Sequence, residues 1–512
     1  MKYANHYILL IISAVVFTAG ISSTDIYFLD EAKNAVCARE MMENSEYVVP
    51  TYNGILRTDK PPLHYYFMIL AYKIFGVTPF AARFFSAIMG VLTVLCVYFF
   101  SKKHLGNIKA FYASLLLIAS LHFNIQMHWS VPDPYFIFFI TLAGCSFYEF
   151  YKTNKKIWWW ILYLSLGCSF LSKGPVGMVL MSLSVFVFLL IKKEFTWKVI
   201  KSINPFVGIP LALAVAFPWF YAVNKATDGK FTEGFFLKHN IDRFSNEMEG
   251  HGGVFLLTIA FVVLGLIPWF FFFGNYKLVK KMIKENSFYL FSFCVSASIV
   301  FFFMISGTKL PNYTVPAYPW LFVLLSGILL NVEKKKPYVI AIVVLSVVLP
   351  IGVIIGIKQD KVIHDLYVLG FSFFIVSIGA IVAFFYRDTQ YRWINILNGS
   401  WLIMALVFFY IVFPIVDKQN PVQKTISFFD KNEAVAGYKI VNSAFIFKLE
   451  KEIPVYRSLE ELQNFIEKHP EGGKIITRAG KENELQLESI GLKEVAREKD
   501  LFENPTTLIL GF

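Results

Sequence analysis

The sequence has little charge for its length. Asp, Glu, Lys and Arg make up 16% of its 512 residues, whereas soluble domains carry about 25%. Hydrophobic residues make up 56%, and the mean hydropathy is +0.56. So few charged groups cannot cover the surface of a water-soluble protein of this size. The composition therefore excludes an ordinary soluble enzyme and indicates an integral membrane protein.

Cysteine is also scarce. The chain has five cysteines, and only Cys37 lies outside the long apolar runs. This placement argues against a disulfide framework, so we interpret the cysteines as small core residues.

Long apolar runs, by contrast, are abundant. A helix needs about 20 apolar residues to cross a hydrocarbon core about 30 Å thick. About thirteen such runs occur, at residues 7–23, 79–100, 110–128, 133–151, 157–172, 174–191, 204–223, 254–274, 287–306, 311–330, 337–357, 362–386 and 393–413. We predict an all-α polytopic membrane domain over residues 1–415. Its first run is interpreted as an uncleaved helix rather than a signal peptide.

The net charge of +12 has a topological explanation that makes a nucleic-acid partner unnecessary. Lysine and arginine concentrate in alternate loops, for example at residues 192–201, 277–284 and 334–336. Loops rich in positive charge face the cytoplasm. This predicts a cytoplasmic N-terminus and, after an odd number of spans, a C-terminal domain on the outer side.

Two of the outward loops, residues 22–78 and 224–253, are long. Long loops in a compact domain are usually either functional or disordered. In the first loop, AKNAVCAREMMEN has helical spacing, and PPLHYYFMILAYKIFG begins with proline and continues as an amphipathic, aromatic segment. We predict short helices that lie along the outer membrane surface.

Residues 416–512 are less hydrophobic and predict a small soluble α/β domain. Strands are expected at YKIVNSAFIF, GKIITR, VAREKD and TTLILGF, with helices at residues 458–469 and 482–490. This region has no Gly-rich phosphate loop, no Cys/His metal spacing and no nucleophile elbow. A structural or acceptor-guiding cap is its expected role.

Carboxylates mark the outer ends of two spans. Asp30 and Glu31 follow the first span, and Asp133 begins another span between two prolines in WSVPDPYF. A simple helix cap is the alternative for each of them. Ionisable residues in membrane segments cost about 2.5–3.5 kcal/mol at a helix centre and therefore tend to be functional. We take Asp30 and Asp133 as candidate catalytic residues and Glu31 as a candidate substrate-binding residue.

Cationic residues occur in the same outer layer: Lys60 in RTDKPPLHYY, Lys173 in SKGP, Arg243 in HNIDRF and Lys309 in SGTKLPNY. Each alone is explained by a side chain that reaches the interface. Together with the carboxylates they describe a site for an anionic head group, because Lys and Arg are the usual partners of phosphate. Their neighbours Asp59 and Tyr313 are further substrate-binding candidates.

His251 lies between two glycines in the second long loop. A lone loop histidine is more often simply solvated. With Asp59 or Glu31 nearby it would bind a divalent metal, although no ligand spacing in the sequence supports this. No cofactor is otherwise indicated.

Six motifs occur in a fixed order: DEAKNAVCAREM, LRTDKPPLHYYFMILAYKIFG, VPDPYF, SKGP, FFLKHNIDRF and GTKLPNYTVPAYP. In this order they resemble the bacterial lipid-linked glycosyltransferases of the glycosyltransferase-C superfamily. The likeness is strongest to the aminoarabinose transferases that modify lipid A, with protein O-mannosyltransferases as more distant relatives. The resemblance covers about residues 5–415.

The resemblance implies a thirteen-helix fold and a donor sugar carried on a polyprenyl phosphate, normally undecaprenyl phosphate. It implies transfer with inversion onto a lipid A-like acceptor at the outer face of the bacterial cytoplasmic membrane, with a periplasmic C-terminal domain. Asp30 matches the catalytic carboxylate, Asp133 the second acidic position and Lys60 the lysine that holds the donor phosphate. Further polar positions of the cavity are matched by Arg243, His251 and Lys309.

One departure concerns Asp59, which stands where the aminoarabinose transferases usually carry Glu. This departure leaves the identity of the sugar and of the acceptor open. A glycan or protein acceptor remains open. A transporter or flippase of lipid-linked sugars is the rival from another class. Transporters place ionisable residues near the bilayer midplane in discontinuous helices, whereas here they gather at one face. The sequence therefore favours chemistry at the surface of the membrane lipid over transport, and it leaves the acceptor open.

Overall fold

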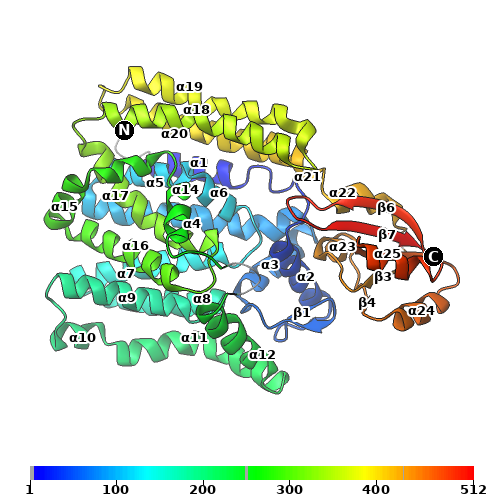
Figure 1. Ribbon diagram of the computed structural model, residues 1–512. Helices are drawn as coiled ribbons and strands as arrows, with labels where there is room; N and C mark the ends of the chain where they lie inside the picture. The colour runs from blue at the N-terminus through cyan, green and yellow to red at the C-terminus, as the bar shows by residue number, and fades with distance from the viewer. Residues whose placement is uncertain (1–4, 248–251, 431) are drawn as a thin grey trace.

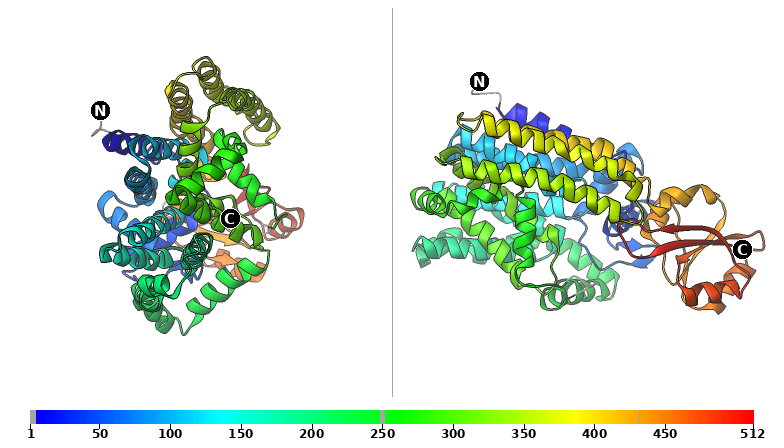
Figure 2. Two further views of the ribbon diagram at one scale, coloured as in Figure 1. Left: turned by 90° about the vertical axis from the view of Figure 1, so that its left-hand side faces the viewer. Right: turned by 45° about the horizontal axis from the view of Figure 1, so that its top comes forward.

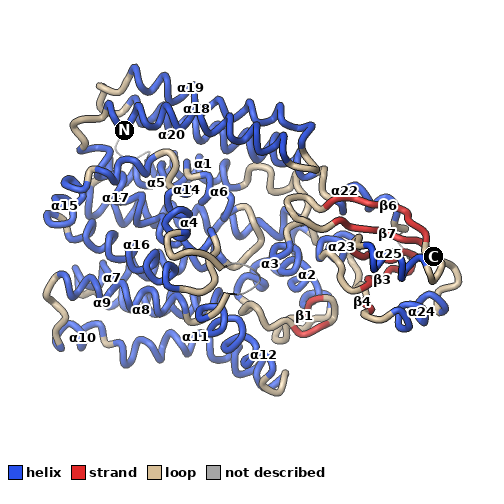
Figure 3. The backbone as a smooth tube through the Cα atoms, in the orientation of Figure 1, coloured by secondary structure: helices blue, strands red, loops and turns tan. Residues whose placement is uncertain are grey.

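The computed structural model describes residues 5–247, 252–430 and 432–512. A domain of long helices makes up most of the chain, and a small domain that contains a β-sheet stands at one end of it (Figure 1). The right-hand view of Figure 2 also places the sheet domain at that end. Strands occur only there and in one short hairpin beside it (Figure 3).

Each predicted span coincides with a helix or with two helical segments in succession. These are α1 (Asn5–Phe17), α4 (Pro79–Leu105), α5 (Asn107–Ala119) with α6 (Leu121–Met127), α7 (Asp133–Thr153), α8 (Lys156–Lys173), α9 (Val176–Ile191), α11 (Pro205–Ala226), α14 (Leu257–Gly265) with η2 (Trp269–Gly274), α16 (Ser287–Ile305), η3 (Pro311–Ala317) with α17 (Tyr318–Asn331), α18 (Lys336–Gln359), η4 (His364–Phe373) with α19 (Phe374–Phe385), and α20 (Arg392–Val407) with η5 (Phe408–Val412).

Among the described residues, seven helices are long and apolar enough to cross a membrane, and the bent pair of α5 and α6 makes an eighth if it counts as one span. Helices α1 and α9 are apolar but shorter. The chain is therefore a multi-pass membrane protein, and the number thirteen stays a prediction.

The first long loop contains the two helices predicted for it, α2 (Leu29–Glu43) and α3 (Leu63–Phe75). Between them lies a hairpin that was not predicted, β1 (Thr51–Tyr52) with β2 (Ile55–Leu56). Its turn residues Asn53 and Gly54 have φ of 55° and 72°, and Asn-Gly is the sequence that two-residue hairpin turns favour.

The second long loop is also helical. It contains α12 (Lys230–Glu233), the π-helix η1 (Gly234–Asp242) and α13 (Arg243–Ser245). Shorter segments elsewhere are α10 (Trp197–Ile203), α15 (Tyr276–Glu285), α21 (Phe413–Asp417), α22 (Pro421–Thr425) and η6 (Ile426–Phe428).

The sheet domain has the strand order β4-β3-β5-β7-β6. Its strands are β3 (Ala434–Tyr438), β4 (Val455–Tyr456), β5 (Gly473–Arg478), β6 (Lys493–Lys499) and β7 (Thr506–Gly511), and its helices are α23 (Ser443–Lys448), α24 (Leu459–Glu467) and α25 (Lys481–Glu488). Strand β3 pairs in parallel with β4 and β5, and β7 runs antiparallel to β5 and β6.

The strand predicted at YKIVNSAFIF is wrong. The strand β3 ends at Tyr438, and Lys439 has a φ of 64°, a left-handed conformation that interrupts an extended chain. The side chain of Asn442 then accepts a hydrogen bond from the Ala444 amide and caps α23. The apolar residues after Asn442 are therefore buried on a helix rather than on a strand.

Helix α2 lies between the two domains (Figure 1). The buried Arg39 of α2 donates from Nη1 to the carbonyl oxygens of Ile446 and Phe447, at 3.0 and 3.3 Å. In the hairpin, Asn53 donates to the Ile453 carbonyl at 2.7 Å and accepts from the Ile453 amide at 2.8 Å. The sheet domain thus holds both segments of the first long loop.

Candidate active site

Five predicted substrate-binding residues line one cavity of about 300 Å³. They are Asp59, Lys60, Lys173, Arg243 and Tyr313. The remaining wall is largely aromatic, with Phe136, Phe235, Phe244, Phe302 and Phe303. The cavity therefore combines positive charge with an apolar surface, and it draws on segments far apart in the sequence.

Local sequence explains where these side chains stand. Lys60 precedes Pro61 and Pro62, and α3 begins directly after them, because proline disfavours helix for the residue before it and tolerates the first helical turn. Lys173 is the last residue of α8, which ends at Gly174 with a φ of 79°, a left-handed cap that suits glycine.

Asp30 begins the outer helix α2, in the first turn, where a negative charge interacts favourably with the helix dipole. Its side chain keeps contact with solvent. Burial by surrounding protein atoms raises its pKa, but the positive charges of Lys60, Arg57, Lys33 and Arg243 outweigh this effect, and the pKa is lowered overall. Asp30 is therefore ionised at neutral pH.

The pKa of Lys60 is lowered, first by burial and then by the like charges of Arg243, Lys173 and Arg57, while the charge of Asp30 raises it. Repulsion among these cations indicates that the cavity favours an anion. A phosphate group would relieve it.

Asp133 stands in the first turn of α7, with proline on both sides. Its Oδ1 accepts from Lys173 Nζ at 2.6 Å and from Asn312 Nδ2 at 3.1 Å. The Lys173 ammonium also lies 5.2 Å from the ring centre of Tyr313. Asp133 thus orients a cation of the cavity wall.

Asp59 is held by residues that the sequence reasoning missed. His239 Nε2 lies 3.1 Å from its Oδ1, and Arg57 Nε lies 3.4 Å from its Oδ2. Burial alone would raise the pKa of Asp59. The hydrogen bond from His239 and the charge of Arg57 outweigh this effect, so the pKa is lowered overall. His239 stands in the FFLKHNIDRF motif, three residues before Asp242. Its place in this motif was the sequence feature that could have identified it as a site residue.

Arg57 is buried, with 5% of its surface exposed. Its Nη1 and Nη2 have no hydrogen-bond partner among the described residues. Because Arg57 is close enough to influence the pKa of both Asp30 and Asp59, it sets the charge state of the two carboxylates.

Four predicted site residues are not among those that line the cavity: Asp30, Asp133, Glu31 and Lys309. Asp30 influences the pKa of Lys60 and Asp133 holds Lys173, so these two act on the cavity through lining residues. The Glu31 carboxylate is buried in an ion pair with Arg83 and also accepts from the Ser130 amide at 3.0 Å. Lys309 is buried too, and its Nζ donates to the Ser306 carbonyl at 2.5 Å. Their proposed contact with substrate stays a prediction.

His251 lies outside the described residues. Among the residues that are described, no group of three or more His, Cys, Asp or Glu is placed to hold a metal ion. Asp59 and His239 form a pair only. A divalent metal therefore stays an open expectation from the sequence.

Comparisons with known proteins also point to glycosyltransferases. A family model described as dolichyl-phosphate-mannose-protein mannosyltransferase matches residues 59–221. An undecaprenyl phosphate-alpha-4-amino-4-deoxy-L-arabinose arabinosyl transferase of Proteus mirabilis is 29% identical over 294 residues, which are 56% of this chain and 52% of that protein. The chain is related to these glycosyltransferases. The resemblance stated from the six motifs is thereby confirmed.

An uncharacterized protein of Aquifex aeolicus is 30% identical over 63% of this chain and 64% of its own length. The matches thus span about half to two thirds of these relatives. The crystal structure of ArnT from Cupriavidus metallidurans bound to undecaprenyl phosphate has a TM-score of 0.85 at 18% identity, over 99% of this chain and 98% of that one. The chain therefore has the fold of that transferase along its whole length.

Proposed function

We propose that this protein is a glycosyltransferase that moves a sugar from a polyprenyl phosphate, such as undecaprenyl phosphate, to a lipid acceptor at the outer face of the cytoplasmic membrane. The observation that carries this proposal is the cavity that joins Lys60, Lys173 and Arg243 to an aromatic wall, with the Asp30 helix beside it. The chain's relation to undecaprenyl phosphate-aminoarabinose transferases supports an undecaprenyl phosphate donor.

The donor has two chemical parts that the cavity matches. Its phosphate suits Lys60 and Arg243, because cationic side chains form charge-assisted hydrogen bonds with phosphate oxygens. Its lipid suits the Phe302 and Phe303 side of the wall. Lys173 is held by Asp133 and completes the positive lining.

The reaction breaks the bond between the anomeric carbon and the carrier phosphate and forms a bond from that carbon to the acceptor oxygen. Lys60 and Arg243 stabilise the electron pair that stays on the leaving phosphate. Direct displacement inverts the anomeric carbon. These two cations act where negative charge develops.

The lowered pKa of Asp30 limits its role as a base. A general base works best when its pKa lies near the working pH, and Asp30 lies far below it. Asp30 therefore acts chiefly as a carboxylate that orients the acceptor. This favours an acceptor that needs little deprotonation, such as a lipid phosphate, over a protein hydroxyl.

The test is transfer of radiolabelled sugar from a panel of undecaprenyl-phosphate sugars into membranes that contain the wild type. Label in the lipid fraction supports the proposal. Label in protein or polysaccharide keeps the enzyme class and changes the acceptor. If no donor reacts and the protein instead accelerates the movement of lipid-linked sugar across the bilayer, the transporter alternative replaces it.

The orientation of the protein in the membrane is proposed from the distribution of lysine and arginine alone. In this proposal the N-terminus lies in the cytoplasm and the sheet domain lies in the periplasm. An alkaline phosphatase reporter fused after Phe512 is expected to be active, because that enzyme requires the periplasm. Activity only of a reporter that works in the cytoplasm would overturn this orientation.

A further inference from the structure

A second cavity lies at the end of the helical domain opposite the sheet domain, around α15 (Figure 1). Its volume is about 900 Å³, three times that of the candidate active site. It is formed where α15 meets α16, where α17 meets α18, and by one residue of α5. It shares no lining residue with the candidate active site.

The cavity is basic. It is lined by Lys109, Lys277, Lys281 and Lys334, against two glutamates, Glu285 and Glu333. Lys281 approaches Glu285 at 3.9 Å, which is long for an ion pair. In the described part of the chain, the other three lysines have no carboxylate partner within 4 Å. The positive-inside rule accounts for lysines at this end. It does not account for a cavity that four of them line.

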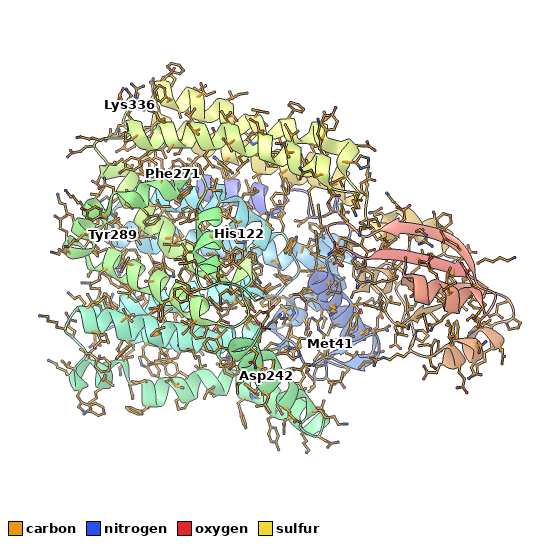
Figure 4. All side chains as sticks on the ribbon, viewed as in Figure 1. Met41, His122, Asp242, Phe271, Tyr289 and Lys336 are labelled. Atoms are coloured by element: carbon orange, nitrogen blue, oxygen red, sulfur yellow. The ribbon has the colours of Figure 1, made fainter. Side chains whose placement is uncertain are left out.

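A buried tyrosine closes the inner side of the cavity. Tyr289 lines the cavity with 3% of its surface exposed, and its Oη has no hydrogen-bond partner among the described residues. Figure 4 marks Tyr289 at this end of the helical domain. Lys109 Nζ lies 5.8 Å from the centre of its ring. The hydroxyl itself lies against the buried Gly327 of α17, so the ring of Tyr289, rather than its hydroxyl, faces the cavity.

Helix α15 places the cavity at the depth of lipid head groups. Its sequence YKLVKKMIKE is strongly two-sided: Met282 is buried against the helical domain, whereas Lys277, Lys280 and Lys281 are exposed. Basic amphipathic helices of this kind lie in the membrane interface and attract anionic lipids. An interfacial α15 would bring the cavity next to the phosphate layer of one leaflet.

We propose that this cavity binds the phosphate-bearing head group of an anionic phospholipid. Lys277, Lys281 and Lys334 hold the phosphate charge, and Lys109 with the Tyr289 ring forms the inner wall. A lipid is favoured over a soluble phosphate compound because α15 belongs to the interface. The proposal is independent of the transfer reaction, since no lining residue is shared with the candidate active site.

The test is native mass spectrometry of the full-length protein in detergent, titrated with phosphatidylglycerol or with zwitterionic phosphatidylcholine. The decisive variant combines Lys277→Gln, Lys281→Gln and Lys334→Gln. Its matched control combines Lys193→Gln, Lys198→Gln and Lys201→Gln, which removes the same charge beside and within α10, at the same end of the molecule (Figure 1).

The wild type is expected to bind phosphatidylglycerol about tenfold or more tightly than phosphatidylcholine, because each lysine near an anionic head group contributes favourably. The decisive variant should lose this preference and the control should keep it.

Three results would overturn the proposal. The first is equal binding of the two lipids by the wild type. The second is an equal loss of preference in both triple variants, which would leave only general surface charge. The third is complete displacement of phosphatidylglycerol by inorganic phosphate at the same concentration, which would assign the cavity to a soluble anion.

Discussion

Glu31 and Arg83 form a buried two-point ion pair: Nε lies 2.7 Å from Oε1 and Nη2 lies 2.8 Å from Oε2. The same guanidinium donates to the carbonyl oxygens of Ile21 and Thr24. Helix α2, which carries Asp30, is thereby fixed to the membrane helix α4. On its far side Arg39 fixes it to the sheet domain.

Glu31→Gln should therefore reduce stability more than it alters the chemistry. Removing one partner of a buried ion pair leaves the other charge uncompensated, at a cost of about 3–5 kcal/mol. We expect a lower thermal unfolding midpoint in detergent, with transfer by the folded fraction largely retained. A normal midpoint with lost transfer would instead support direct contact of Glu31 with substrate.

Docking of the sheet domain should affect transfer at a distance. Arg39→Met removes the bonds to Ile446 and Phe447, and Asn53→Ala removes both bonds to Ile453. The combined variant should lower kcat, because α2 and the segment before Lys60 lose a common support. Arg497→Gln is the control, since Arg497 pairs only with Glu484 and Glu494 inside the sheet domain. Equal effects in the control and the combined variant would exclude this coupling.

The pH profile of transfer should move when Arg57 loses its charge. Arg57 lowers the pKa of Asp30 and Asp59, and it also lowers the pKa of Lys60. In Arg57→Gln all three values rise, so both the acid and the alkaline limb should shift to higher pH. Arg57→Lys keeps the charge and should leave both limbs in place. A profile that does not move in Arg57→Gln would contradict this electrostatic role.

The same shifts have a consequence for stability. A carboxylate whose pKa is lower in the folded state stabilises the protein above its unfolded value, which is about 3.9 for Asp. That contribution is lost progressively as the pH falls from the unfolded value through the lowered folded value. Wild-type unfolding midpoints should therefore decline below about pH 4, and Asp59→Asn should decline less steeply there. An unchanged slope in Asp59→Asn would count against the shift.

The pair of Asp133 and Lys173 should matter mainly for donor binding. Lys173→Ala removes one positive charge from the cavity wall and the partner of Asp133. We expect KM for the undecaprenyl-phosphate sugar to rise about tenfold, in line with one charge-assisted hydrogen bond, with a smaller fall in kcat. Asp133→Asn should raise KM less. The amide oxygen of the new side chain can still accept the hydrogen bond from Asn312 that Asp133 Oδ1 accepts, and the positive charge of Lys173 stays in the cavity wall. A fall in kcat alone would show that Lys173 acts in the transition state.

Sequence reasoning was most successful where the signal is local. Long apolar runs gave the helices, and the helices α2 and α3 followed from spacing and from the prolines before Leu63. The hairpin at Asn53 was missed although Asn-Gly marks it. The strand predicted at 438–447 failed because its apolar pattern does not distinguish a strand from a short helix capped by Asn442.

Partners distant in sequence could not be predicted. Glu31 looked like a substrate ligand because it adjoins Asp30, and its actual partner Arg83 stands 52 residues away. His239 lies next to Asp59 only through folding of the second long loop. Four charged residues of the cavity, Asp59, Lys60, Lys173 and Arg243, were nevertheless found from the sequence, because charged groups are few and conspicuous in an apolar chain.

The central claim is that Asp30 and Lys60 act together on a polyprenyl-phosphate sugar. The most direct measurement compares initial rates of sugar transfer by purified wild type, Asp30→Asn, Lys60→Gln and the control Asp388→Asn, whose carboxylate is exposed far from the cavity. We expect losses of about 100-fold or more in both site variants, as for groups that act in the transition state, with unchanged unfolding midpoints and full activity in the control. Wild-type rates in either site variant would contradict the account.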